Sequence, residues 1–399
     1  MSQPSPTSPT TDRLRLFVAS APGIEPLLQH ELEGLGVEEA TAVAGGVACF
    51  GDLETVYRLN LGSGLGLRVL VHVADFIVRD FRKLERVAAA LEWERWLNPE
   101  RGVRVRAHAK RSRLYHTGGI AERIERGIEL RTKGKVRLRA DEALGPGGGE
   151  LGEGAREPTL IQVRLVRDRC TISVDTTGTL LHKRGWRQQT GKAPLREDIA
   201  RALLLSAGWK PGMAVLDPLA GSGTLVIEAA SMAAGLPPGH ARSFSCMEQP
   251  DFDAALFAKA KAELTRAAVP LGDATLIGGE RDTGSVEAAR ANAARAGVGD
   301  RVEFRERSLG DADLPELRGD GSVLVSNPPW GMRTGDPARL RDLYASLGNL
   351  AQQLGNKPVR VGVVTNENVL AHATKLGLQR ALMTDAGGVK VGLWVGGVG

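Results

Sequence analysis

Two turns in the second half of the chain each follow a short apolar run. The first, Asp217-Pro218-Leu219-Ala220-Gly221-Ser222-Gly223-Thr224, comes after Val215 and Leu216. The second, Asn327-Pro328-Pro329-Trp330, comes after the run from Ser322 to Ser326. Buried parallel strands are apolar runs of this kind, and α/β folds place their ligands at the carboxyl ends of such strands. The two turns therefore constrain both the fold and the position of the site.

Strand-like and helix-like patterns alternate regularly after residue 194. Strands are predicted at 213–217, 275–279, 301–305, 323–326 and 359–365, and helices at 194–207, 224–234 and 283–296. Regular alternation predicts an α/β fold with a doubly wound, largely parallel sheet, so that both turns would lie on one rim. A final pair of strands, 378–384 and 388–395, is predicted as a hairpin at the sheet edge.

The glycine-rich turn predicts a nucleoside-type cofactor. Gly221, Ser222 and Gly223 follow a strand and open a helix, where backbone N–H groups can face a ligand. Position 226 is Val, where a dinucleotide fingerprint needs a third glycine, and no Gly-Lys-Ser/Thr motif follows. A pyrophosphate ligand is therefore disfavoured. Glu280, after the next strand, is placed to accept hydrogen bonds from ribose hydroxyls, and this role is favoured over the alternative of a carboxylate that stabilises the N-terminus of the following helix. S-adenosylmethionine, which has a ribose and no phosphate, fits this pattern.

The second turn predicts recognition of a planar amine. The Asn327 side-chain oxygen and the Pro328 carbonyl could accept hydrogen bonds from such an amine and orient it. Trp330 could stack on a base taken out of its helix. Catalysis would then depend on positioning beside a reactive sulfonium. The alternative is that Pro328 and Pro329 only end a strand and that Trp330 packs in a core.

Positive charge is concentrated in the first half of the chain. The formal net charge is +5 and the pI is about 9.2. Between Arg101 and Ala140, however, thirteen Lys or Arg face three Glu, a local net of +10. Such an excess favours a polyanion partner, and Arg123 and Arg126 are the predicted contacts. A merely solubilising surface is the alternative.

The first half is predicted to be mixed α/β without the regular alternation. Strands are expected at 14–19, 43–50, 68–73, 103–108, 159–165 and 171–176, and helices at 23–36, 81–97 and 118–130. Residues 1–12 are predicted to be a disordered tail. The segment 141–158, rich in Gly, Pro and Glu, is predicted to be a flexible surface insertion.

Several classes of protein are disfavoured by the composition. No apolar run approaches the length of a membrane span. Cys49, Cys170 and Cys246 match no metal or redox spacing, so they are interpreted as structural thiols in a reducing, cytoplasmic setting. The histidines show no ligand spacing, and no metal site is expected.

These motifs resemble those of the THUMP-containing RNA guanine-N2 methyltransferases, with the RlmL-type enzymes of large-subunit ribosomal RNA as the nearest group. Besides the two turns, the similar segments include Ile227-Glu228-Ala229-Ala230, Leu16 to Gly36 and Leu180-Leu181-His182-Lys183-Arg184-Gly185-Trp186-Arg187. The resemblance covers nearly the whole chain from Leu14 onward. It implies a ferredoxin-like domain at 13–60, an RNA-binding THUMP domain at 61–180 and a class I (Rossmann-like) methyltransferase domain at 181–399.

The resemblance also implies roles for individual residues. It places cofactor contacts at Asp217, Gly221, Ser222, Gly223, Thr224, Glu280, Asp282 and Ser308, and catalytic roles at Asn327, Pro328 and Trp330. Two of these positions depart from the family. The family's aromatic residue is commonly Tyr, so Trp330 lacks a hydroxyl. Members often carry Asp where this chain has Ser308, so Asp311 or a backbone group could contact the adenine instead. The chain also ends after one catalytic domain, whereas some RlmL-type proteins continue into a second.

The expected function is transfer of a methyl group from S-adenosylmethionine to the 2-amino group of a guanosine in RNA, with 23S ribosomal RNA favoured. Related enzymes modify tRNA with the same motifs. Methylation of DNA adenine or of a protein glutamine also uses Asn-Pro-Pro-aromatic turns, but the basic first half favours RNA. A non-catalytic RNA-binding assembly factor is the alternative from another class.

Overall fold

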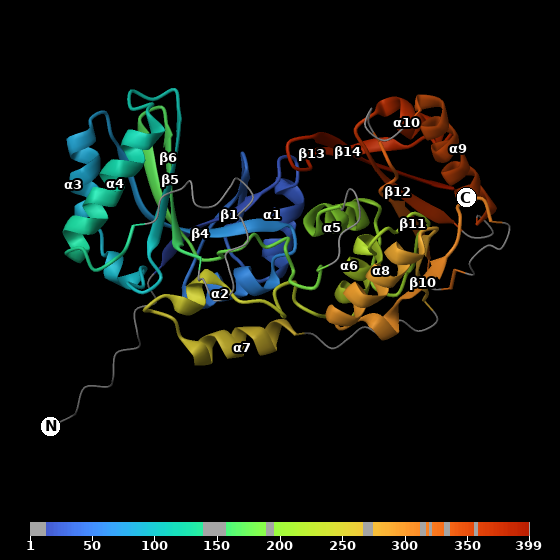
Figure 1. Ribbon diagram of the computed structural model, residues 1–399, viewed down its shortest axis with the longest axis horizontal. Coiled ribbons are helices and arrows are strands. Elements are labelled where there is room, and N and C mark those ends of the chain that lie inside the picture. The colour runs from blue at the N-terminus through green and yellow to red at the C-terminus, as the bar shows by residue number, and fades with distance from the viewer. Residues whose placement is uncertain are drawn as a thin grey trace.

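The computed structural model describes residues 13–138, 157–188, 195–265, 274–311, 317–318, 321–330, 336–354 and 358–398 (Figure 1). The predicted tail and nearly all of the predicted insertion lie outside the described residues. The chain forms two seven-stranded sheets, which we call the N-terminal sheet and the C-terminal sheet.

The N-terminal sheet has the order β2-β3-β1-β4-β7-β6-β5 and is antiparallel except for the pair β5–β6. It crosses the predicted boundary between residues 60 and 61 without interruption, and that boundary falls inside a helix. The ranges assigned to a ferredoxin-like and a THUMP domain therefore stay predictions. The strands are β1 (Leu14–Ser20), β2 (Thr41–Val43), β3 (Gly46–Gly51), β4 (Gly66–Ile77), β5 (Val103–Lys110), β6 (Thr159–Val166) and β7 (Arg169–Asp175).

Four helices cover one face of this sheet: α1 (Glu25–Gly34), α2 (Leu53–Gly62), α3 (Phe81–Ala90) and α4 (Thr117–Thr132). Alternate strand residues, such as Leu16 and Val18 of β1, are buried with the apolar stripes of the helices. This alternation of period two is what a sheet with one covered face requires.

The predicted helix 81–97 is wrong in its second half. Helix α3 ends at Ala90, and Leu91 is extended before a short 3₁₀ turn, Trp93–Arg95. Trp93 is fully buried, and its indole nitrogen donates a hydrogen bond to the Ala88 carbonyl at 2.7 Å. The chain leaves the helix because burial of this large ring and satisfaction of a helix-end carbonyl outweigh one more helical turn.

The C-terminal sheet has the order β10-β9-β8-β11-β12-β14-β13, in which the first five strands are parallel and β14 runs antiparallel to both of its neighbours. The predicted doubly wound sheet and the hairpin at its edge are confirmed. The strands are β8 (Ala214–Asp217), β9 (Leu276–Glu280), β10 (Glu303–Glu306), β11 (Ser322–Ser326), β12 (Val359–Thr365), β13 (Gln379–Asp385) and β14 (Lys390–Val398).

Both faces of the C-terminal sheet are covered, which explains why its central strands, such as β8 and β11, are buried apolar runs. Val215 packs in one cluster with α5, α6 and α8, whereas the next residue, Leu216, packs in the other with α9 and α10. These helices are α5 (Glu197–Ser206), α6 (Thr224–Ala233), α8 (Thr283–Arg295), α9 (Pro337–Gln353) and α10 (Asn368–Ala373).

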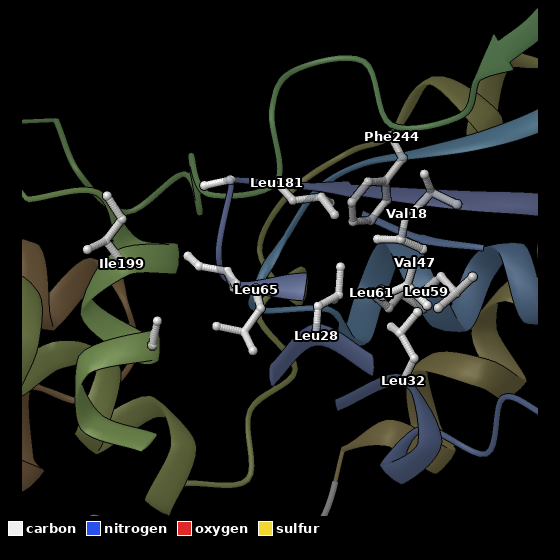
Figure 2. Packing of buried hydrophobic residues seen from close by; sticks show 14 of the residues in the cluster. Val18, Leu28, Leu32, Val47, Leu59, Leu61, Leu65, Leu181, Ile199 and Phe244 are labelled. Atoms are coloured by element: carbon white, nitrogen blue, oxygen red, sulfur yellow. The ribbon is translucent and has the colours of Figure 1, made fainter. Parts of the chain in front are cut away.

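The two halves share a core. Figure 2 shows Ile199 of α5 on one side of Leu65 and Leu181, and Leu28 and Val18 of the N-terminal half on the other side. All five belong to one cluster of buried residues. Below them in Figure 1, α7 (Ala254–Leu264) lies against α2. The sequence patterns did not predict α7, whose chain segment leaves the C-terminal sheet after α6 and returns at β9.

Buried ion pairs reinforce this junction. Arg184 contacts Glu228 of α6 at 3.1 Å, and the other oxygen of Glu228 lies 3.3 Å from Arg201 of α5. Arg201 also pairs with Glu31 of α1 at 3.1 Å, and Arg184 donates to the carbonyl of Gly64 at 2.6 Å. Breaking a buried pair leaves an uncompensated charge, so these contacts favour one relative placement of the halves.

Candidate active site

The two turns singled out in the sequence leave the same edge of the C-terminal sheet from neighbouring strands. Strands β8 and β11 are parallel partners, with Leu216 opposite Leu324. The glycine-rich turn continues from β8 and the Asn-Pro-Pro-Trp turn continues from β11. The predicted placement of both turns on one rim is confirmed.

A hydrogen bond between side chains joins the two turns. Asp217 is buried, and its Oδ1 accepts from the Ser326 hydroxyl at 3.1 Å and from the backbone N–H of Leu219 at 3.1 Å. Burial raises the pKa of Asp217 to about 7, while these two hydrogen bonds act in the opposite direction. The carboxyl group therefore changes charge near neutral pH, at the base of both turns.

The two glycines of the cofactor turn serve different purposes. Gly223 caps α6 with φ +89°, and a Cβ there would lie 2.8 Å from the Phe304 ring. Gly221 has φ +52°, and a Cβ built on it would meet nothing within 4 Å. Gly223 is thus needed for packing, whereas Gly221 leaves open space where a ligand can approach the backbone.

Glu280 lies directly beside the glycine turn. Its Oε2 accepts from the N–H of Gly221 at 3.2 Å, and its Oε1 accepts from the N–H groups of Arg281 and Asp282 at 2.9 and 3.1 Å. A carboxylate has about four acceptor sites, so one further hydrogen bond can be accommodated. The ribose contact stays a prediction. Glu280 offers a carboxylate acceptor for it directly beside Gly221.

Three of the predicted cofactor residues already have partners in the protein. Asp282 caps α8 by accepting from the N–H of Ser285 at 2.8 Å. The Thr224 hydroxyl accepts from Arg187 at 2.8 Å. The carbonyl of Ser222 accepts from the side chain of Asn292 at 3.1 Å. These contacts shape the turn, and cofactor roles for the three residues remain predictions.

The two candidates for adenine recognition lie in one turn after β10. The N–H of Ser308 donates to the Asp311 carboxylate at 2.8 Å, and both residues are exposed. The preceding residue, Arg307, donates its N–H to the carbonyl of Glu280 at 2.9 Å. The turn is thereby held next to Glu280, on the cofactor side of the rim.

The Asn-Pro-Pro-Trp turn makes an internal contact that the sequence did not predict. The indole N–H of Trp330 donates to Oδ1 of Asn327 at 3.2 Å. Trp330 is half-buried and packs against both hydrophobic clusters, Pro328 is buried, and Pro329 is exposed. Trp330 thus packs partly in the core, as the alternative interpretation of this turn expected. It also orients the amide oxygen that is proposed to bind the amine.

Arg187 is a residue of this site to which the sequence patterns assigned no role. Besides Thr224, it donates to the Leu195 carbonyl at 2.7 Å and lies 3.1 Å from Glu197. Burial raises the pKa of Glu197 to about 7, and the Arg187 guanidinium opposes that shift. Arg187 lies in the run 180–187 that carries the family resemblance, which was the only signal available.

Other sequence predictions can be checked in the described residues. The three cysteines are free and buried, as expected for structural thiols, and burial raises the pKa of each to about 12. Among the described residues, no group of three or more His, Cys, Asp or Glu side chains could hold a metal ion. In the same part of the chain, no helix is both long and apolar enough to cross a membrane.

Comparison with known proteins identifies two parts of the chain. The UPF0020 model, described as an RMKL-like methyltransferase domain, matches residues 184–386. The model of the RlmL ferredoxin-like domain matches residues 15–70. The first match spans the C-terminal sheet up to its last strand, and the second spans β1 to the first residues of β4.

Individual relatives agree with these matches. The ribosomal RNA large subunit methyltransferase K/L of Syntrophotalea carbinolica is 36% identical over 83% of this chain, and a putative RNA methyltransferase of Synechocystis is 30% identical over 84% of it. The chain spans 46% of the first relative's length and 85% of the second's.

A solved structure covers nearly the whole chain. SMU.472, a putative methyltransferase in complex with S-adenosylhomocysteine, superposes with a TM-score of 0.82 at 28% identity, over 96% of this chain and 97% of that one. The open space outside Gly221, beside the acceptors of Glu280 and the Ser308 turn, fits such a nucleoside ligand. The chain therefore belongs to the UPF0020 family of S-adenosylmethionine-dependent methyltransferases, with a class I Rossmann-like catalytic domain preceded by an RlmL-type ferredoxin-like domain.

Proposed function

We propose that this protein methylates the exocyclic N2 amine of a guanosine in RNA, with 23S ribosomal RNA as the favoured substrate. The observation that carries the proposal is the joined rim: the Asn327 amide and the cofactor turn leave adjacent strands, β11 and β8, and are tied together by the bond between Asp217 and Ser326. An amine held by Asn327 would lie next to a methyl donor held by the glycine turn.

The residues of this chain would act mainly by positioning. S-adenosylmethionine, when bound, supplies an electrophilic methyl group on a sulfonium. Oδ1 of Asn327 and the carbonyl of Pro328 accept hydrogen bonds from the two N–H bonds of the amine, which turns its lone pair toward the incoming carbon. Because a carbonyl oxygen has two lone pairs, Oδ1 can keep its bond from Trp330 while it binds the amine. Trp330 stacks on the base.

RNA is favoured over other amine substrates by the charge of the first half and by the relatives. Two relatives are named as methyltransferases, one of large-subunit ribosomal RNA and the other, putatively, of RNA. The region 61–180 would supply RNA binding as a THUMP domain, and a cytoplasmic location would follow from a ribosomal substrate. Transfer RNA is the second candidate, because the same turn motifs serve tRNA-modifying enzymes of this type.

Two experiments test the proposal. Calorimetric titration with S-adenosylmethionine should show binding, and absence of binding at millimolar cofactor would leave only the non-catalytic assembly factor. Methylated guanosines should then be mapped in total rRNA and tRNA from cells with and without the protein. A guanosine that loses its N2-methyl group names the substrate, and a loss confined to adenosine or to protein glutamine would reject guanine N2.

A further inference from the structure

Within the described residues, one face of the N-terminal sheet carries no helix from its own half of the molecule. Helices α1 to α4 pack on the face that carries Leu16, Val71, Val105 and Val163. The register places the alternate residues on the opposite face, which we call the open face. A sheet with one face packed and the other solvated is expected to present polar residues there.

The open face is rich in positive charge. Seven basic side chains and two carboxylates occupy its strand positions, an excess of five by count: Arg15, Arg68, Arg104, Arg106, Lys110, Arg164 and Arg169 against Asp75 and Asp175. Arg104 is buried and Arg68 is largely buried beside Asp175, so the basic residues that this face exposes are Arg15, Arg106, Lys110, Arg164 and Arg169. By contrast, α3 and α4 together carry six basic residues and four carboxylates, an excess of two. The +10 stretch of the sequence is therefore divided between the two faces.

Both carboxylates on the open face are neutralised locally. Asp75 lies 2.7 Å from Arg169 and 3.2 Å from Arg15, and Asp175 is paired with Arg68. On the helical face, Arg123 and Arg126 share one carboxylate, Glu85, at 3.1 and 3.5 Å. These two arginines of α4, which the sequence predicted to bind RNA, are thus already paired with a carboxylate of α3.

The two ends of the open face carry different side chains. One row of opposed residues crosses six strands, from β5 to β3: Arg106, Gln162, Ser173, His72, Arg15 and Phe50. Exposed basic residues, including Lys110, Arg164 and Arg169, lie at the β5–β6–β7 end.

Rings lie at the other end of the row. Phe17 stacks on His72 with ring centroids 6.0 Å apart, and the Arg13 guanidinium lies 4.5 Å over the Phe50 ring. Burial lowers the pKa of His72 to about 4, so this ring is neutral at pH 7, and its Nδ1 lies 2.8 Å from the Ser173 hydroxyl oxygen.

We propose that the open face binds an unpaired stretch of the RNA substrate, with phosphates over β5, β6 and β7 and bases over the rings of β3, β1 and β4. This rests on the proposed function, which makes RNA the substrate. Unstacked bases stack on aromatic side chains of a flat sheet, whereas the deep, narrow major groove of an RNA duplex does not admit side chains of such a surface. The excess positive charge matches a phosphate backbone.

The test compares equal charge reversals on the two faces. Lys110→Glu with Arg164→Glu changes the open face, and Arg82→Glu with Arg86→Glu makes the same change on the exposed side of α3. Affinity for a fluorescent 16-nucleotide single-stranded RNA is measured by anisotropy at several KCl concentrations. The open-face variant should lose at least tenfold, with a salt slope lower by about 1.4, because each lost phosphate contact removes about 0.7. The α3 variant should stay within about twofold.

Further arms test the mode of binding. Phe50→Ala should weaken binding of the single strand about fivefold or more through lost stacking. The same RNA annealed to its complement should bind the wild type more weakly. Equal losses for both charge-reversal variants, or tighter binding of the duplex, would overturn the proposal. Thermal unfolding of each variant shows whether it is folded.

Failure of the proposed function has a different signature. If the wild type binds RNA through the open face but transfers no methyl group to protein-free rRNA, the surface stands and the activity falls. If the wild type methylates rRNA while the open-face variant binds as tightly as the wild type, the activity stands and the surface falls.

Discussion

The two seven-stranded sheets of this protein expose their chemistry in different places. The C-terminal sheet is largely parallel and covered on both faces, so its central strands are apolar and only their carboxyl ends reach a ligand. The N-terminal sheet is largely antiparallel and its helices cover one face, so alternate strand residues such as Lys110, Arg164 and Arg169 are exposed and can meet a partner. A doubly covered sheet concentrates function in a few residues, whereas a singly covered sheet spreads it over a surface.

Electrostatics follows the same division. The carboxyl group of Asp217, at a strand end of the C-terminal sheet, is held by a hydroxyl and an N–H. The carboxylates Asp75 and Asp175 of the N-terminal sheet are held by arginines. Asp217 is thus held by uncharged donors, and the carboxylates of the N-terminal sheet are held by positive charges that also compensate them on a surface proposed to attract RNA.

The largest expected effect comes from Asn327→Ala, which removes the proposed amine acceptor at a single strand end. Methylation should fall by more than about a hundredfold, the usual loss for one positioned polar group in an active site. Affinity for S-adenosylmethionine and for RNA should change less than about twofold. The measurements are transfer of labelled methyl groups to rRNA and calorimetric titration of the cofactor.

The matched control is Asn366→Ala, which changes an exposed asparagine just after the neighbouring strand β12. It should retain full activity. If both variants kept activity, Asn327 would not bind the amine, and the carboxyl end of β11 would not be the catalytic position that the comparison of the two sheets assigns to it.

The second effect is a pH dependence of stability that Asp217→Asn should reduce. The pKa of Asp217 is about 7 in the fold against an ordinary value of 3.8, so the folded state binds more protons between these pH values. Stability therefore falls as pH rises through this window. Between pH 5 and pH 8, the ionisation of Asp217 should lower the free energy of unfolding of the wild type by on the order of 2 kcal/mol. The variant should not show this part of the decrease. Urea unfolding at both pH values measures the decrease in each protein.

Glu197 shifts in the same direction, so the variant should keep part of the wild type's pH dependence. Identical slopes for the two proteins would show that Asp217 is ionised in the fold at every pH tested. The two turns would then be joined by a charged group.

The sequence predicted the C-terminal half better than the N-terminal half, for a physical reason. Parallel strands buried on both faces give runs such as Val323-Leu324-Val325, and the two strands of the site, β8 and β11, are followed by turns whose Gly or Pro residues can be seen directly. In the N-terminal half, the exit of the chain from α3 depends on burial of Trp93 against partners distant in sequence. No local pattern contains that information.

Within the site, positions were predictable but partners were not. Gly221, Glu280 and Asn327 follow strand ends, so their shared rim could be inferred. The bond between Thr224 and Arg187, and that between Asp217 and Ser326, join residues 37 and 109 positions apart, and their pairing is set by packing. The open face was likewise invisible, because the +10 stretch mixes residues of one strand edge with residues of a helix on the other face.

A third prediction concerns the open space beside the cofactor turn. Gly221→Ala should weaken binding of S-adenosylmethionine about tenfold, because its Cβ enters the space left for the ligand and strains a residue with φ +52°. Gly297→Ala is the control for strain alone: Gly297 has φ +73°, also has nothing within 4 Å, and follows the far end of α8. Calorimetry measures affinity, and thermal unfolding measures strain. Equal affinities for S-adenosylmethionine in the two variants would show that the cofactor does not occupy the space beside Gly221.

The smallest expected effect separates the ring of Trp330 from its N–H group. Trp330→Phe keeps a ring that can stack but removes the donor to Asn327 Oδ1, a bond worth about 1 kcal/mol. The amide is then less well oriented, so kcat should fall about threefold with little change in KM. Trp330→Ala loses the ring as well and should fall further in kcat/KM, by at least about tenfold. A phenylalanine variant as active as the wild type would leave Trp330 with stacking alone. Equal losses in both variants would mean that the ring contributes only by holding Asn327, and the strand end would then act through a single side chain.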